Sequence, residues 1–294
     1  MSVNGTITHL RAGDYEATVA SVGASLVSLT YRGRHLVQPF AEDELSDGYQ
    51  GCILVPWPNR IVGGRYVVDG TVLQVPVTEL ATGSALHGLG CFQHWVPSDL
   101  AISSGTWSID LPPVQGYPFD VVCQVDYALD AQHGLSVTIT GTNEGTASAP
   151  FGASIHPYLS CDLRPVDECT LRIPALTYLR TDEALRPTHL VPVAGTAADF
   201  AMPRLVSTTQ VDNAYTDLPE GEWAVELSHP DGGGVRLISD ARWVQLYTGD
   251  RLGRLGAAVE PMTCGPDAFN RDLPGVLLPP GRSRVLSLAI LAIG

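Results

Sequence analysis

The sequence contains no lysine, so all 17 basic residues among its 294 are arginines. This absence excludes a lysine Schiff base, a lysine general base and a Walker-type phosphate loop, because each of these requires a lysine amine. No glycine-rich segment with dinucleotide-binding spacing lies between a strand-like and a helix-like run either. The chain therefore lacks the signatures of the commonest nucleotide-dependent and imine-forming enzymes.

Positive charge is scarce, because 31 acidic residues give the chain a formal net charge of −14. Nucleic acids and anionic membrane surfaces bind clustered cations, so we expect neither as a partner. No apolar run approaches the roughly 18 residues of a membrane helix, and the first residues lack the pattern of a secretory signal. The six cysteines include no C-x-x-C pair, which is typical of reduced thiols. We therefore predict a cytoplasmic protein.

Amphipathic helix patterns are also missing, and apolar residues recur with the period of two that is typical of strands. Residues 66–75 predict a hairpin whose two-residue turn is Asp69-Gly70. In residues 121–129 and 135–139, apolar side chains alternate with mostly polar ones. This alternation predicts an antiparallel pair of strands with one solvated face.

Turn residues separate these runs throughout the chain, which contains 30 glycines and 22 prolines. Hydrophobic residues make up 45% of the sequence, which is ample for a buried core. We predict an all-β fold in which residues 1–294 form one large antiparallel β-sandwich domain. The acidic segment 41–51 is predicted to be a surface loop.

Two residues have the chemistry and the setting for proton transfer. Glu260 follows a strand-like apolar run and precedes Pro261, and His156 lies in the comparable segment 151–159. Burial raises the proton affinity of a carboxyl group and makes it usable as a general base near neutral pH. Taken alone, a glutamate at a strand end is more often simply solvated. Together, the two residues indicate an acid–base pair for an uncharged substrate.

Further residues are of the kinds that bind carbohydrate. Asn59 and Arg60 lie on a proline-stiffened segment, His87 precedes a glycine, and Asp212 and Gln245 lie in strand-like segments. Planar polar groups of this kind bind pairs of sugar hydroxyls. Four of these residues also have a plainer interpretation. Arg60 could be a loop brace that bonds backbone carbonyls and His87 a packed histidine, whereas Asp212 could be a turn residue and Gln245 a polar strand position.

The histidine at position 87 also belongs to a group with the spacing of a possible zinc site, His87, Cys91 and His94. A structural zinc site needs four ligands, and no fourth ligand lies nearby in the sequence. We therefore predict that the protein binds no metal.

The order of these residues along the chain resembles that in the aldose 1-epimerase, or mutarotase, family. The similarity comprises Asn59-Arg-Ile61, Leu86-His-Gly88 with Trp95, Ile155-His-Pro-Tyr158, Asp212-Asn-Ala-Tyr215, Gln245 and Glu260-Pro-Met-Thr263. It implies a galactose mutarotase-like β-supersandwich and a small-molecule sugar substrate. It implies no cofactor, and we expect a monomer or a homodimer.

The resemblance also implies roles for individual residues. Glu260 matches the general base that takes the proton of the anomeric hydroxyl at C1, and His156 matches the general acid that protonates the ring oxygen. The ring then opens, rotation about C1–C2 exposes the other carbonyl face, and closure gives the other anomer. For this the glutamate must begin ionised and the histidine protonated. The positions that hold the sugar hydroxyls or the ring oxygen are matched by Asn59, Arg60, His87, Tyr158, Asp212 and Gln245.

The identity of the sugar stays open at this stage. The segment Ser154-Ile-His-Pro-Tyr-Leu-Ser160 lacks the asparagines and the phenylalanine that surround this histidine in galactose mutarotases, so glucose or galactose is only a default expectation. A phosphorylated or sulfonated sugar would need a further cation near C6, for which Arg180, Arg251 and Arg254 are candidates. A non-catalytic sugar-binding module on the same fold is another alternative. A glycosidase is a third, with Asp212 as its second carboxylate.

Overall fold

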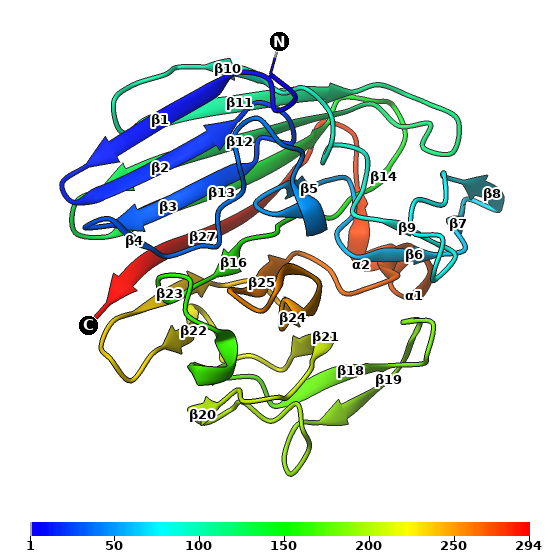
Figure 1. The fold of residues 1–294 in the computed structure, drawn as a ribbon. Helices are drawn as coiled ribbons and strands as arrows, with labels where there is room; N and C mark the ends of the chain where they lie inside the picture. The colour runs from blue at the N-terminus through cyan, green and yellow to red at the C-terminus, as the bar shows by residue number, and fades with distance from the viewer. Residues whose placement is uncertain (1) are drawn as a thin grey trace.

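The computed structural model describes residues 2–294 as a set of antiparallel β-sheets with two short helices (Figure 1). The helices are α1 (Ala268–Arg271) and α2 (Leu273–Val276). This architecture confirms the predicted all-β sandwich class. Neither helix has the length and the apolar character that crossing a membrane would require, and residues 2–294 contain no other α-helix.

The largest sheet has nine strands in the order β10-β11-β12-β13-β27-β23-β22-β17-β20. In that order the strands are β10 (Val96–Ser98), β11 (Ser104–Leu111), β12 (Val121–Asp130), β13 (Gly134–Asn143), β27 (Ser283–Ile293), β23 (Gly234–Ser239), β22 (Trp223–Ser228), β17 (Thr170–Arg172) and β20 (Arg204–Leu205). Every second residue of β12 is buried from Val121 to Leu129, whereas the residues between them are partly or fully exposed. β12 pairs with β13 over its whole length, so the predicted antiparallel pair with one solvated face is confirmed.

The second large sheet has eight strands and carries most of the functional residues described below. Seven of them follow the order β19 (Pro187–Pro192), β18 (Thr177–Thr181), β21 (Asp212–Thr216), β24 (Trp243–Tyr247), β25 (Ala257–Met262), β15 (Ser154–Ile155) and β5 (Ile53–Leu54). The eighth, β16 (Tyr158–Leu159), also pairs with β25. All six residues of β25 are buried, and this strand is flanked on both sides by other strands.

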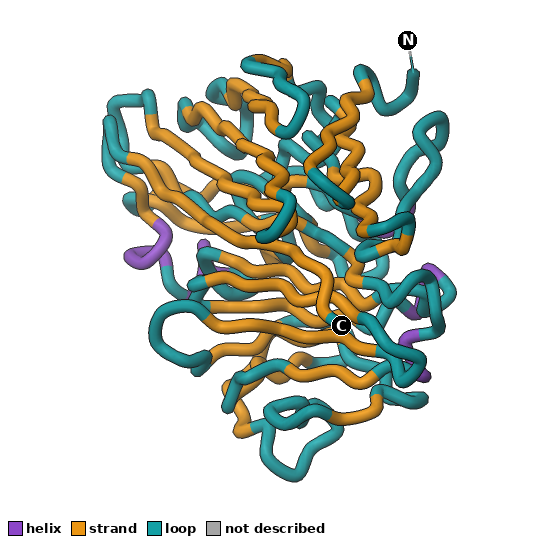
Figure 2. Tube along the Cα trace, turned by 90° about the vertical axis from the view of Figure 1, so that its left-hand side faces the viewer, coloured by secondary structure: helices purple, strands orange, loops and turns teal. Residues whose placement is uncertain are grey.

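A four-stranded sheet covers one end of the nine-stranded sheet. It consists of β1 (Ile7–Ala12), β2 (Tyr15–Ala20), β3 (Leu26–Tyr31) and β4 (Arg34–His35). β1 and β2 contact β12, and in Figure 1 these blue strands lie against the green ones. Figure 2 shows the strands as stacked layers with loops at their ends. The apolar side chains between the layers form one large buried cluster that includes Trp95, Trp107 and Tyr127.

Smaller elements complete the fold at its edges. β6 (Arg60–Val62) pairs with β9 (Ser84–Leu86), β7 (Arg65–Val68) with β8 (Thr71–Gln74), and β14 (Ala149–Pro150) with β26 (Leu277–Leu278). Three single 3₁₀ turns are η1 (Asp47–Tyr49), η2 (Val166–Glu168) and η3 (Asp250–Leu252). The β7–β8 hairpin confirms the predicted turn, since Asp69 and Gly70 both have positive φ, as a type I′ turn requires.

Candidate active site

A pocket of about 430 Å³ opens on one face of the eight-stranded sheet. Its wall contains all eight residues that the sequence singled out, namely Asn59, Arg60, His87, His156, Tyr158, Asp212, Gln245 and Glu260. These residues come from segments far apart in the chain, and the fold brings them to one place. The volume is in the range of small-molecule binding sites.

Three of these side chains are placed by strand register. Glu260 on β25 lies directly opposite Gln245 on β24, so the two side chains leave the same face of the sheet. Asp212 lies two residues from the partner of Gln245 on β21 and therefore shares that face as well. Because side chains alternate along a strand, this register aligns a carboxylate, an amide and a second carboxylate across three neighbouring strands.

The imidazole of His156 is directed at Glu260 from the segment between β15 and β16. Its Nε2 atom lies 3.2 Å from Oε1 of Glu260, and the two side chains are only 6% and 2% exposed. The backbone of His156 is fixed on both sides, since its N–H donates to Cys52 and its carbonyl accepts from Gly51. The histidine and the carboxyl group therefore form a preorganised, buried contact across which a proton can pass.

Burial favours the neutral form of both members of this pair. It lowers the pKa of His156 to about 3, assisted by the positive charge of Arg60, although the local backbone opposes the shift. Burial also raises the pKa of Glu260 well above its usual range, with help from Asp212 and against the charge of Arg60. The expected starting state had an ionised glutamate and a protonated histidine, whereas burial favours the neutral form of each. The two states differ only by the position of one proton along the 3.2 Å contact.

His87 lines the same pocket, and its ring is placed to donate a hydrogen bond there. The backbone N–H of Asn59 donates to the ring atom Nδ1 of His87, and the backbone N–H of His87 donates to the backbone carbonyl of Asn59. Burial lowers the pKa of His87 well below its usual range, so its ring is neutral. Because Nδ1 accepts, the proton of the neutral ring resides on Nε2.

A chain of amide and carboxylate contacts fixes the orientation of the polar wall. Nδ2 of Asn59 donates to Oε1 of Gln245, and Nε2 of Gln245 donates to Oδ1 of Asp212 at 2.6 Å. Oδ1 of Asn59 accepts the backbone N–H of Arg60. These contacts fix which end of each side-chain amide is the oxygen and which is the nitrogen. Oδ2 of Asp212 is not used by Gln245 and can accept another hydrogen bond.

Arg60 is held by a carboxylate that the sequence reasoning missed. Its Nε and Nη2 atoms donate to the two oxygens of Glu79 at 2.7 and 2.9 Å. The same Nη2 atom lies 4.0 Å from Oδ2 of Asp212. The guanidinium is therefore held by side-chain carboxylates and not by the backbone carbonyls considered for a loop brace.

An aromatic wall was missed as well, because its main residue lies in the segment predicted to be a surface loop. Residues 41–45 of that segment are exposed, but Tyr49 is half-buried and lines the pocket. The Tyr49 ring lies 4.6 Å from that of His87 and 5.3 Å from that of Phe92. The Tyr158 ring stacks on His156 at 5.0 Å, and its hydroxyl donates to the carbonyl of Gly48. Tyr158 therefore braces both the imidazole and the turn that carries Tyr49.

The three arginines considered for an anionic sugar have different environments. Arg251 lines the pocket, is exposed, and has no ion-pair partner among residues 2–294. Arg254 is occupied by Asp167 and Asp250. Arg180 lies on β18 and is not among the residues that line the pocket. Only Arg251 has its charge available at the pocket.

The zinc grouping considered from the sequence is not assembled in the structure. Cys91 packs in a small apolar cluster with Cys52, and Nε2 of His94 contacts the hydroxyl of Ser21. His87 instead lies with His156 and Glu260, with one potential ligand atom of each within 4.8 Å of the others. The proton on Nε2 of His87 makes that atom a donor and not a metal ligand in this arrangement. The geometry suits hydrogen bonding to an oxygen-rich ligand better than metal binding.

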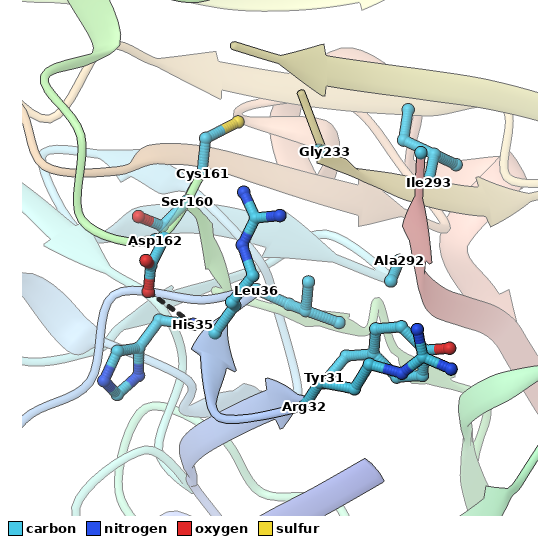
Figure 3. Close-up of a pocket in the computed structure, with 13 residues that line it drawn as sticks. Tyr31, Arg32, His35, Leu36, Ser160, Cys161, Asp162, Gly233, Ala292 and Ile293 are labelled. Atoms are coloured by element: carbon cyan, nitrogen blue, oxygen red, sulfur yellow. Dashed lines mark hydrogen bonds between the residues drawn. The ribbon is translucent and has the colours of Figure 1, made fainter. Parts of the chain in front are cut away.

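A second, smaller hollow of about 100 Å³ lies near the C-terminus (Figure 3). Arg34, Cys161 and Asp162 are among the residues that line it, and Asp162 accepts the backbone N–H of His35. None of the eight predicted site residues lines this hollow. The pocket that these eight residues line is therefore the candidate active site.

Comparison with known proteins identifies the family of this chain. The family model for aldose 1-epimerase matches residues 6–290. This chain belongs to the aldose 1-epimerase family. The resemblance inferred from the order of the motifs is thereby confirmed.

Relatives of this family member span its whole length. The uncharacterized protein YihR of Escherichia coli strain K12 is 41% identical, over 96% of this chain and 92% of its own length. Rat galactose mutarotase is 26% identical, over 92% of this chain and 89% of its own. The crystal structure of the GalM/aldose epimerase homologue from C. elegans superposes with a TM-score of 0.89 at 20% identity, covering 98% of both chains. The structural likeness establishes the shared fold, and the relatives agree with the family assignment.

Proposed function

We propose that this family member is an aldose 1-epimerase that interconverts the α and β anomers of an aldohexose. The observation that carries the proposal is the contact of 3.2 Å between Nε2 of His156 and Oε1 of Glu260 at a buried position in the pocket. Mutarotation requires a proton to leave O1 and another to arrive at O5. These two oxygens are bonded to the same carbon, so an acid and a base that lie side by side fit them.

In the proposed cycle, Glu260 takes the proton of the anomeric hydroxyl while His156 protonates the ring oxygen. Burial favours a neutral Glu260 and a neutral His156, and the pair reaches the charged state when the carboxyl proton moves along the contact to the imidazole. Sugar hydroxyls that donate to Glu260 favour the ionised carboxylate, because hydrogen bonds to a charged form stabilise it. Stacking on the Tyr158 ring favours the protonated histidine through a cation–π interaction. Ring opening, rotation about C1–C2 and closure then yield the other anomer.

The other polar residues hold the sugar in this orientation. His87 donates a hydrogen bond from Nε2–H to a sugar oxygen, and Asp212 accepts a hydrogen bond from a sugar hydroxyl through the oxygen that Gln245 leaves unused. Asn59 and Gln245 stabilise one another at the base of the pocket. Tyr49 offers a ring face to the C–H side of the pyranose.

The experiment that tests this proposal is polarimetry of freshly dissolved α-D-glucose and α-D-galactose, with and without the protein. We expect a faster approach to the same final rotation. Glu260→Gln should lower kcat by at least about 10³-fold, and His156→Asn by about 10²-fold or more. Sugar binding, followed by calorimetry, should change little in Glu260→Gln because the amide retains the shape of the side chain.

Glu226→Gln is the matched control for the loss of a glutamate charge. Glu226 forms a partly exposed pair with Arg236 on β22 and β23 and does not line the pocket. We expect wild-type turnover from this variant. Wild-type mutarotation by Glu260→Gln would refute the assignment of the base. Sugar binding without any acceleration by the wild-type protein would instead favour the alternative of a non-catalytic binding module.

A second candidate substrate class is favoured by the charge of Arg251. An exposed arginine without an ion-pair partner at the rim of a sugar pocket can bind a phosphate or sulfonate group. A phosphorylated or sulfonated hexose would then be preferred over the neutral sugar. We expect Arg251→Gln to raise KM for such a substrate and to leave KM for glucose unchanged, with Arg180→Gln as the exposed control away from the pocket. Equal KM values for charged and neutral sugars would exclude this preference.

A further inference from the structure

Glu79 is a partly buried charge that the proposed proton transfer does not use. It lies between β8 and β9, its side chain is 20% exposed, and it lines the pocket. Its carboxylate accepts two hydrogen bonds from Arg60 and one from the hydroxyl of Thr82. The backbone of Glu79 also exchanges two hydrogen bonds with Ser84. The carboxylate is therefore fixed by its own turn, independently of any ligand.

This arrangement fixes the direction of the Arg60 guanidinium. The group is a rigid planar fork, and Glu79 occupies both Nε and one proton of Nη2. No residue among 2–294 accepts a hydrogen bond from Nη1 of Arg60, and the arginine lines the pocket. With one edge of the fork held in place, the remaining donors have a fixed direction before a sugar arrives.

Glu79 also determines how strongly the charge of Arg60 acts on the acid–base pair. The positive charge of Arg60 lowers the pKa of both Glu260 and His156. Burial would raise the pKa of Glu79, but the bonds and charge of Arg60 outweigh it and hold that pKa low, so Glu79 is ionised. An ionised carboxylate at 2.7 Å offsets most of the field of the guanidinium at longer range.

Other ionisable groups surround these residues. His156, Asp212, Arg60 and the Tyr158 hydroxyl act on Glu260. Arg60, Arg251, Asp212 and Tyr49 are the groups that interact with Glu79. Of these, Arg60 alone forms an ion pair with Glu79 within residues 2–294. The effect of Glu79 on the acid–base pair is therefore expected to pass mainly through Arg60.

We propose that Glu79 is a positioning residue that aims Arg60 at the sugar and screens its charge from Glu260 and His156. This inference rests on the proposed function, because the aimed donor binds the sugar and the screened pair carries out the proton transfer. Glu79 touches neither the sugar nor a reacting atom in this role.

Three variants of the full chain separate aim from charge. Glu79→Gln keeps the shape and one acceptor but removes the charge, and Thr82→Val removes only a donor that holds the carboxylate. Glu226→Gln is the matched control, because Glu226 accepts from Nε and Nη2 of Arg236 at 2.8 and 2.7 Å away from the pocket. Thermal unfolding of each variant shows whether it is folded, and Thr82→Val is conservative enough to keep the test usable if Glu79→Gln is not.

Polarimetry against pH then gives KM, kcat and both limbs of the profile. We expect Glu79→Gln to raise KM about 3- to 10-fold and to move both limbs toward lower pH by at least about 0.3 unit, because an unscreened cation disfavours protonation of both groups. Thr82→Val should raise KM without moving the limbs, and Glu226→Gln should change neither. A wild-type KM in both Glu79→Gln and Thr82→Val overturns the aiming role. Unmoved limbs in Glu79→Gln overturn the screening role.

A titration that needs no turnover separates this inference from the proposed function. The carboxyl carbon of Glu260, followed by ¹³C NMR against pH and assigned with Glu260→Gln, should titrate at lower pH in Glu79→Gln than in the wild type. The midpoint should be the same in Glu226→Gln and the wild type. If the wild-type protein fails to accelerate mutarotation while this midpoint moves, the proposed function fails and the screening role stands. An unchanged midpoint overturns the screening role even in an active enzyme.

Discussion

Replacing Glu260 by glutamine should stabilise the protein while it removes the proposed general base. Glu260 is 1% exposed, and its pKa is raised by burial and by Asp212. Above its usual pKa of 4.5 the unfolded chain releases this proton, whereas the folded protein retains it. A group with a raised folded-state pKa makes its full contribution to stability below the unfolded value and loses it as the pH rises. Glutamine has no proton to release, so the variant escapes this loss.

The size of the gain follows from linkage. Each pH unit between the unfolded and the folded pKa removes about 1.4 kcal/mol from the free energy of unfolding of the wild-type protein. The difference between variant and wild type should be near zero at pH 4.5 and should grow at up to this slope. At pH 7 it cannot exceed about 3.5 kcal/mol, since only 2.5 pH units separate pH 7 from the unfolded value. A gain of 1 to 3 kcal/mol corresponds to a rise in Tm of roughly 2 to 5 °C in a chain of this size.

Urea unfolding at pH 5, 6, 7 and 8 measures this difference directly. The control is Glu226→Gln, whose glutamate is paired with Arg236 at a partly exposed position and should give no gain that grows with pH. A difference for Glu260→Gln that stays constant across these pH values would refute the reasoning. So would a variant that is less stable than the wild type at pH 7, because the glutamate would then be stabilised in its charged form.

Three other substitutions probe the surroundings of the pair. The pKa of His156 is lowered to about 3 from its usual 6.5, so its contribution to stability is complete above pH 6.5 and is lost as the pH falls. In urea titrations between pH 6.5 and 5, the free energy of unfolding should therefore fall less steeply for His156→Gln than for the wild type, by up to about 1.4 kcal/mol per pH unit. A Cβ atom at Gly88 would lie 2.1 Å from a backbone oxygen, whereas a Cβ atom at Gly70, a residue of similar positive φ, would meet open space. Gly88→Ala should therefore cost about 3 kcal/mol of stability or more and Gly70→Ala about 1 kcal/mol, both followed as changes in Tm. Tyr158→Phe removes the hydrogen bond to Gly48 and keeps the ring, so about 1 kcal/mol of stability should be lost and KM should rise more than kcat falls.

The sequence predicted those parts of the fold that depend on local pattern. Alternation in residues 121–129 corresponds to the buried face of β12, and Asp69-Gly70 forms the turn of the β7–β8 hairpin. Both depend on neighbouring residues, so a single sequence is sufficient. Seven of the eight site residues were singled out by their chemistry and their setting, and Tyr158 by the resemblance to a family. The register that places Gln245 opposite Glu260 is set by long-range pairing that no local pattern reveals.

What the sequence could not provide was the partner of each charge. Glu79 lies in a segment without periodicity, and only the pairing of β6 with β9 brings it to Arg60. Tyr49 lies next to an acidic, exposed stretch, and its side chain lines the pocket where a surface loop was expected. The sequence led us to expect an ionised Glu260 and a protonated His156, whereas burial inside the fold favours the neutral form of both. The sequence shows the residue types but not their burial.

The division of the pocket between strands and loops has a consequence for how such a protein can diversify. Glu260, Gln245 and Asp212 belong to a hydrogen-bonded ladder, in which a slip of one residue would turn every side chain to the other face. The rim comes instead from connecting segments, which carry Tyr49, Phe92, Leu185 and Arg251. Insertions and substitutions in those segments leave the ladder in register. Proteins that descend from one ancestor can therefore change the ligand that their rim accepts while they inherit the same row of carboxylate, amide and carboxylate side chains.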